Sequence, residues 1–105
     1  MSNEEIIRLL KREMTAIAPE AKAFLYGSRA RGDNTPFSDV DILILLPDSY
    51  EGHEFAKRVD EVSSKLYNIS LEHNIDISPL ITVEKIFNQR ETPFTLNVKK
   101  EGIPL

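Results

Sequence analysis

The chain has 105 residues, with 41% hydrophobic and 29% charged side chains, no cysteine and a formal net charge of −4 at pH 7. The length predicts a single domain over residues 1–105 with one modest core. The absence of cysteine excludes disulfides, thiolate zinc sites and a cysteine nucleophile. The excess of acidic residues argues against direct binding of nucleic acid.

No apolar run is long enough to cross a bilayer, and no charged-then-apolar leader opens the chain. The sequence therefore predicts a cytoplasmic protein without a membrane partner.

The first half of the chain predicts one helix and two strands. Ser2 and Glu5 have the spacing of a capping box, and apolar residues at helical spacing follow until the break at Pro19. Residues 22–26 predict a strand. Residues 39–46 predict a second strand, which is apolar on both faces beyond its first residues and is therefore expected at the centre of a sheet.

The second half predicts a long helix, a strand and two shorter helices. Asp48 and Glu51 are expected to cap the long helix, and residues 73–82 predict the third strand. A short helix is expected over 83–88, and Thr92 begins a last helix that stops at Gly102. The long helix turns a stripe inward, formed by Phe55, Val59, Val62, Leu66 and Ile69. The expected class is α/β, in a two-layer α+β arrangement: a small mixed β-sheet with helices packed on one face.

Two short motifs indicate chemistry. Gly27 and Ser28 follow the first predicted strand, where a glycine lets backbone amides approach a phosphate and the serine hydroxyl adds a hydrogen bond. Asp39 and Asp41 are two apart, so strand alternation places both on one face with Cα atoms ~6.7 Å apart. That separation suits two Mg²⁺ ions ~3.5–4 Å apart. The pattern indicates binding of a nucleoside triphosphate, although a plain tight turn followed by a polar edge strand is the alternative.

Gly27-Ser28, the ten residues 29–38 and Asp39-Val40-Asp41 together match the pattern of the DNA polymerase beta-like nucleotidyltransferase superfamily. The chain resembles the smallest branch, the minimal nucleotidyltransferase domains. The resemblance implies a third acidic residue on a neighbouring strand. Asp76 resembles that residue, which would complete the metal site with Asp39 and Asp41 and accept the proton of an attacking hydroxyl. An ordinary exposed strand aspartate is the alternative.

Two arginines follow the Gly-Ser pair. Arg29 and Arg31 are expected to contact the phosphates and neutralise their charge. The alternative is that both are surface arginines of a short helix, with Arg31 paired to Asp33 or Asp39.

The resemblance also implies a reaction and a partner. Minimal nucleotidyltransferases move AMP from ATP onto a tyrosine of a HEPN-domain toxin, so this chain is expected to be an antitoxin within a hetero-oligomer. Larger relatives carry a further domain that walls the substrate, and here a partner is expected to supply that surface. Two alternatives stay open: a small-molecule nucleotidyltransferase that completes its site by oligomerisation, and a non-catalytic antitoxin that binds its toxin by contact.

Overall fold

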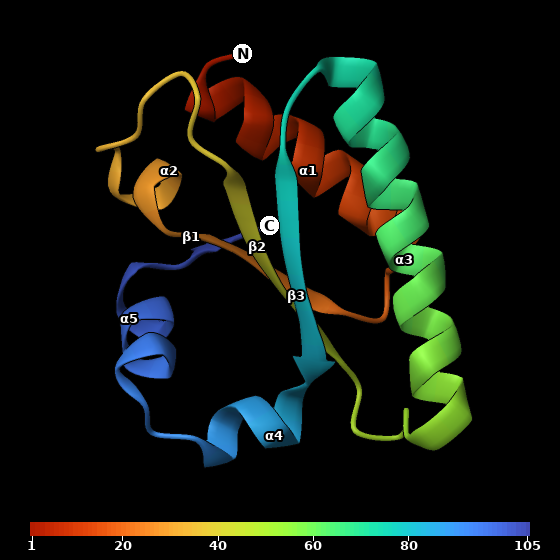
Figure 1. The fold of residues 1–105 in the computed structure, drawn as a ribbon. Coiled ribbons are helices and arrows are strands. Elements are labelled where there is room, and N and C mark those ends of the chain that lie inside the picture. The colour runs from red at the N-terminus through yellow and green to blue at the C-terminus, as the bar shows by residue number, and fades with distance from the viewer.

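A computed structural model describes residues 1–105 as a four-stranded mixed sheet with helices on both sides, in the strand order β3-β2-β1-β4 (Figure 1). β1 pairs antiparallel with β2 and β4, whereas β2 and β3 run parallel. None of the helices is both long and apolar enough to span a membrane. The elements in chain order are α1 (Asn3–Ile17), β1 (Lys22–Tyr26), α2 (Ser28–Arg31), β2 (Val40–Leu46), α3 (Gly52–His73), β3 (Ile77–Val83), α4 (Glu84–Gln89), α5 (Pro93–Glu101) and β4 (Ile103–Pro104).

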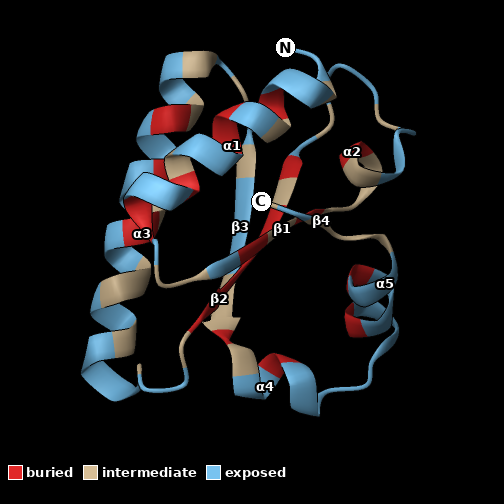
Figure 2. Cartoon of the chain, turned by 180° about the vertical axis from the view of Figure 1, so that it is seen from behind, coloured by how far each residue is buried: buried red, intermediate tan, exposed pale blue.

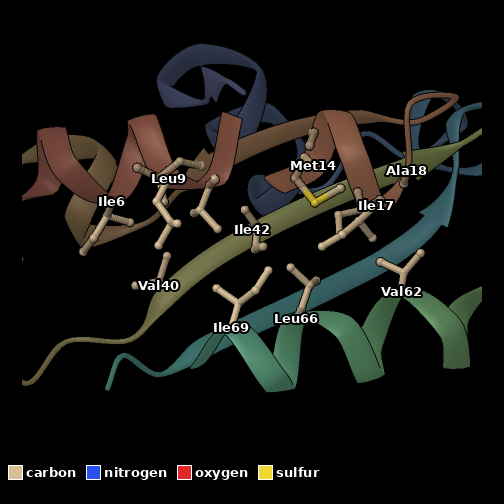
Figure 3. Packing of buried hydrophobic residues seen from close by; sticks show 14 residues of the cluster. Ile6, Leu9, Met14, Ile17, Ala18, Val40, Ile42, Val62, Leu66 and Ile69 are labelled. Carbon is tan, nitrogen blue, oxygen red and sulfur yellow. The ribbon is translucent and has the colours of Figure 1, made fainter. Parts of the chain in front are cut away.

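The central strand β2 separates two apolar clusters, because its side chains alternate between the faces of the sheet. Ile42 and Ile44 belong to the larger cluster of 14 buried residues, which α1 and α3 cover (Figure 3). Leu43 belongs to the second cluster, on the opposite face, with Phe87 of α4 and Val98 of α5. The prediction of helices on one face therefore holds for the two long helices, of which α1 lies in front of the strands in Figure 2. The short helices α4 and α5 pack on part of the other face.

The predicted N-terminal cap is confirmed for α1 but not for α3. Ser2 caps α1 as predicted, because its Oγ accepts from the Glu5 N–H at 3.1 Å and its own N–H donates to the Glu5 carboxylate at 3.0 Å. The predicted cap of α3 is wrong. Glu51 occupies the N-cap position without a side-chain hydrogen bond. Asp48 instead accepts from the Lys85 N–H at 2.7 Å, which joins the end of β2 to α4.

The third strand begins later than the sequence predicts. α3 continues through His73 and ends at Asn74, whose φ of 53° is left-handed, so β3 starts only at Ile77. The Ile77 N–H donates to Ser70 Oγ at 3.3 Å, which fixes the turn between the two elements. Asp76 therefore lies in the connection before β3 and not within the strand.

An ion pair links the segment after α1 to α3. Arg58 donates to the Glu20 carboxylate through Nε at 2.8 Å and Nη2 at 2.9 Å, and Nη2 also donates to the Ile17 carbonyl at 2.8 Å. The side chains of Arg58 and Glu20 are only 15% and 26% exposed. Hydrogen bonding to Arg58 lowers the pKa of Glu20 from 4.5 to about 2.

Glu20→Gln should lower the free energy of unfolding at pH 7 by about 1–2 kcal/mol, since hydrogen bonds to a charged group are lost. The pKa of Glu20 is lower in the folded than in the unfolded state. Its stabilising effect is therefore present above pH 4.5 and is lost as the pH falls towards 2. Urea denaturation between about pH 7 and pH 2.5 measures this.

The matched control is Glu13→Gln, because Glu13 pairs with the exposed Arg12 at 3.5 Å. It should change stability by less than about 0.5 kcal/mol. A Glu20→Gln deficit that stays constant from neutral to acid pH would show that packing, not charge, is responsible.

Candidate active site

Gly27, at the end of β1, lies against the side chain of Asp41. Tyr26 is the register partner of Asp41 in the β1–β2 pair. Gly27 has φ 77° and ψ −156°, a backbone region that essentially only glycine adopts. A Cβ added there would stand 2.6 Å from Asp41 Oδ2. Glycine therefore allows the carboxylate to lie against the turn, and the structure brings the Gly-Ser motif and the second aspartate into one site.

The charge of Asp39 acts on Asp41. Burial raises the pKa of Asp41 above its ordinary value, the nearby charge of Asp39 raises it further, and Arg31 partly opposes the effect. Burial and the charge of Asp41 also raise the pKa of Tyr26. Two neighbouring carboxylates, one of them partly desolvated, form an oxygen donor set of the kind that Mg²⁺ binds. The chemistry of the pair is thus compatible with the predicted Mg²⁺ site, which stays a prediction.

Asp76 lies beside the start of β2, but it does not form a three-residue metal-binding cluster with Asp39 and Asp41. Its carbonyl accepts from the Val40 N–H at 2.7 Å, and one residue further on Asp41 is the register partner of Ser78. The side chain of Asp76 is exposed. No three His, Cys, Asp or Glu side chains in the structure are grouped so that they could hold a metal ion. The structure thus brings Asp39 and Asp41 together and places Asp76 next to them in the α3–β3 connection, and a triad of metal ligands stays a prediction.

Arg29 is buried, with 8% of its surface exposed, and its guanidinium bonds to protein acceptors. Nε and Nη2 donate to the Ser38 carbonyl at 3.1 and 2.9 Å, and Nη1 donates to Asn3 Oδ1 at 2.9 Å. Arg29 therefore fixes the residue immediately before Asp39 relative to the start of α1. Sequence reasoning missed this positioning role, since neither acceptor is recognisable from spacing. The expected contact of Arg29 with phosphate stays a prediction.

Arg31 is exposed and bonds to two carboxylates. Its Nε donates to Asp33 at 3.1 Å, which is one of the alternatives that the sequence offered, and its Nη1 donates to Glu101 of α5 at 3.2 Å. Both bonds raise the pKa of the guanidinium. Its positive charge also acts on Asp41, so Arg31 stands at the edge of the site and its phosphate role stays a prediction.

An aromatic pair next to Asp41 was not foreseen from the sequence. The rings of Tyr26 and Phe94 meet edge to face, with centroids 5.3 Å apart and an interplanar angle of 85°. The contact joins α5 to the end of β1 beside Gly27. No local pattern signals it, because the two residues come from opposite ends of the chain.

Comparisons with known sequences agree with this site. A sequence model described as the nucleotidyltransferase domain matches residues 7–101. A Methanocaldococcus jannaschii protein that bears the name "putative protein adenylyltransferase" is 33% identical over 101 residues, which are 94% of each chain. A second protein of that name and organism is 34% identical over 82 residues, covering 77% of this chain and 73% of that one. A segment of 54 residues, 51% of this chain, is 39% identical to a bifunctional uridylyltransferase/uridylyl-removing enzyme of Psychrobacter sp., of which it spans only 6%.

Two solved structures share the fold. One is the crystal structure of a toxin–antitoxin with AMP-PNP, with a TM-score of 0.52 and 20% identity. The other is a toxin–antitoxin MntA-HpeT mutant, with a TM-score of 0.51 and 18% identity. Each match covers 99% of this chain and 72% of the other. The chain belongs to the nucleotidyltransferase domain family, which confirms the predicted resemblance and fold class.

Proposed function

We propose that this protein transfers AMP from ATP, in the presence of Mg²⁺, to a tyrosine hydroxyl of a HEPN-domain toxin and thereby acts as its antitoxin. The observation that carries the proposal is the Asp41 carboxylate lying against Gly27 beside Asp39, which unites a phosphate-binding turn with a pair of acids. The full-length similarity to proteins named as protein adenylyltransferases supports the reaction. Toxin–antitoxin structures of the same fold, one with AMP-PNP, support the partner and the nucleotide.

In this proposal the triphosphate lies along Gly27 and Ser28, because the first N–H groups of a helix have no partner within it and favour phosphate oxygens. Asp39 and Asp41 would hold Mg²⁺, which would supply polarisation of the α-phosphate and stabilise the charge on the leaving group. Asp76 orients the acceptor hydroxyl and accepts its proton. The acceptor oxygen bonds to the α-phosphorus, the bond from that phosphorus to the bridging oxygen breaks, and pyrophosphate leaves.

The surface around the site is open to a partner. Asp39 and Asp76 are both exposed, while the second apolar cluster with α4 and α5 involves Leu43 and Leu45, further along β2. A partner that docks at the exposed end of the sheet can therefore place a side chain beside these acids.

The test is co-expression with the product of the neighbouring gene, which the proposal expects to be a HEPN-domain protein, followed by incubation with ATP and Mg²⁺. We expect the two proteins to co-purify and the partner to gain the mass of one or more AMP groups on a tyrosine. Intact-mass and peptide mass spectrometry measure the gain, and EDTA should prevent it. The matched control is Asp39→Asn, which should bind the partner without modifying it.

Two other results of this experiment would support the alternative functions. A partner that binds but stays unmodified by the wild-type protein would support an antitoxin that acts by contact. Modification of a small hydroxylated compound, with no protein labelled, would support a small-molecule nucleotidyltransferase.

A further inference from the structure

A cavity of about 720 Å³ opens at the end of the molecule where three segments meet. These are the N-terminus of α1, the connection from α2 to β2 and the connection from α3 to β3, which Figure 1 shows at the same end of the fold. The volume lies within the range of ligand pockets, roughly 300–1,000 Å³. Its lining includes Asn3, Arg29, Phe37, Ser38, Asn74 and Asp76.

The cavity and the candidate active site share one residue, Asp76. Asp76, the expected acceptor of the hydroxyl proton, lines it, whereas Gly27, Ser28, Asp39 and Asp41 lie outside the lining. The Val40 N–H donates to the Asp76 carbonyl at 2.7 Å, so this wall is joined directly to the strand of the acid pair. The cavity therefore adjoins the site near the start of β2, and Arg29 of α2, the residue after Ser28, also lies in its wall.

The side chains of the lining offer no free cation to a triphosphate, although the N-terminal amine of Met1 also lies in the wall. Arg29 is the only cationic side chain in the wall, and its three nitrogen atoms all bond to the Ser38 carbonyl or to Asn3. The negative charge of Asp76 further disfavours phosphate. Asn3 also donates to Asn34 at 2.7 Å, so the wall is held in place before any ligand arrives.

The mouth of the cavity carries an aromatic ring that no other part of the chain covers. Phe37 is 92% exposed, which makes it the most exposed large apolar side chain of the molecule. An exposed aromatic residue next to a polar pocket is typical of a site that receives an amphipathic group. A tyrosyl side chain combines a ring that would pack on Phe37 with a hydroxyl that would reach Asp76.

We propose that this cavity is the acceptor subsite, which binds the tyrosine-bearing segment of the partner and directs its hydroxyl to Asp76. The inference rests on the proposed function and extends it, because it assigns the choice of acceptor to Phe37 and Asn74. Nucleotide binding, in contrast, belongs to the Gly27 side of the same acids.

The test compares Phe37→Ser and Asn74→Gly with the wild type in AMP transfer from radiolabelled ATP to the separately purified partner, added over a range of concentrations. Glycine at position 74 keeps the left-handed backbone while removing the amide. Each variant should raise the KM for the partner about tenfold, equivalent to ~1.4 kcal/mol. The KM for ATP should stay within about twofold, since the nucleotide binds elsewhere.

The matched control is Leu71→Ser on α3, which is 64% exposed and removes an apolar side chain that does not line the cavity. It should leave both constants unchanged. An unchanged KM for the partner in both cavity variants would overturn the inference while the proposed function stands. A raised KM for ATP alone would assign the cavity to the nucleotide and overturn it as well. If the wild type labels no protein, the proposed function fails, and the inference fails with it.

Discussion

Asp41→Asn should abolish AMP transfer and, at the same time, make the metal-free protein more stable at pH 7. In the proposed mechanism, loss of one of the paired carboxylates removes charge that would hold Mg²⁺, which would contribute several kcal/mol to the transition state. Activity should therefore fall by at least about a hundredfold. The pKa of Asp41 is higher in the folded than in the unfolded state, because of burial and the charge of Asp39.

The direction of the stability change follows from that pKa. A raised pKa means that the folded state is favoured at low pH and loses stability as the pH rises through the pKa of the folded form. Asparagine cannot ionise, so the variant should exceed the wild type at neutral pH and match it in acid. Thermal unfolding in EDTA at about pH 7 and pH 3.5 measures the difference.

Addition of Mg²⁺ should reverse the order, since a ligand that binds only the folded wild type raises its apparent stability. Asp60→Asn, at an exposed position of α3, is the matched control and should alter neither activity nor stability. Wild-type turnover in Asp41→Asn would remove this residue from the mechanism.

Gly27→Ala should inactivate the protein and cost about 1–3 kcal/mol of stability. The new methyl group would lie 2.6 Å from Asp41 Oδ2, so either the carboxylate or the turn must move. The backbone of Gly27, at φ 77° and ψ −156°, also resists a side chain. Chemical denaturation and the rate of AMP transfer measure the two effects.

Gly32→Ala separates backbone strain from the contact with the acid. Gly32 also has a positive φ, of 84°, but a Cβ there would meet no atom within 4 Å. This variant should lose about 1 kcal/mol of stability and keep its activity. Equal activity losses at the two glycines would show that the fit between Gly27 and Asp41 is not what matters.

Local patterns were sufficient to predict the main elements of the fold. The capping box at Ser2 located the start of α1, and the doubly apolar run after Asp41 identified the central strand. The Gly-Ser and Asp-x-Asp spacing indicated one site, because strand pairing places Tyr26 opposite Asp41 and therefore Gly27 near the acid.

The features that the sequence did not predict depend on contacts between distant segments. Asp48 accepts from Lys85 instead of capping α3, and Arg29 bonds to Asn3. Alternation alone placed Asp76 within a strand, but a left-handed residue at Asn74 ends the helix late and leaves Asp76 in a turn. No residue spacing along the chain reveals such partners.

The position of Asp41 on β2 links formation of the site to folding of the whole chain. The next five residues of β2 are all buried: Ile42, Leu43, Ile44, Leu45 and Leu46. The strand contributes to both apolar clusters. A partly unfolded chain that loses either cluster must also loosen the strand that holds the acid. Amide hydrogens of β2 should therefore be among the slowest to exchange with solvent. Catalytic competence should then appear only with the fully cooperative native state, and the protein should have no active folding intermediate.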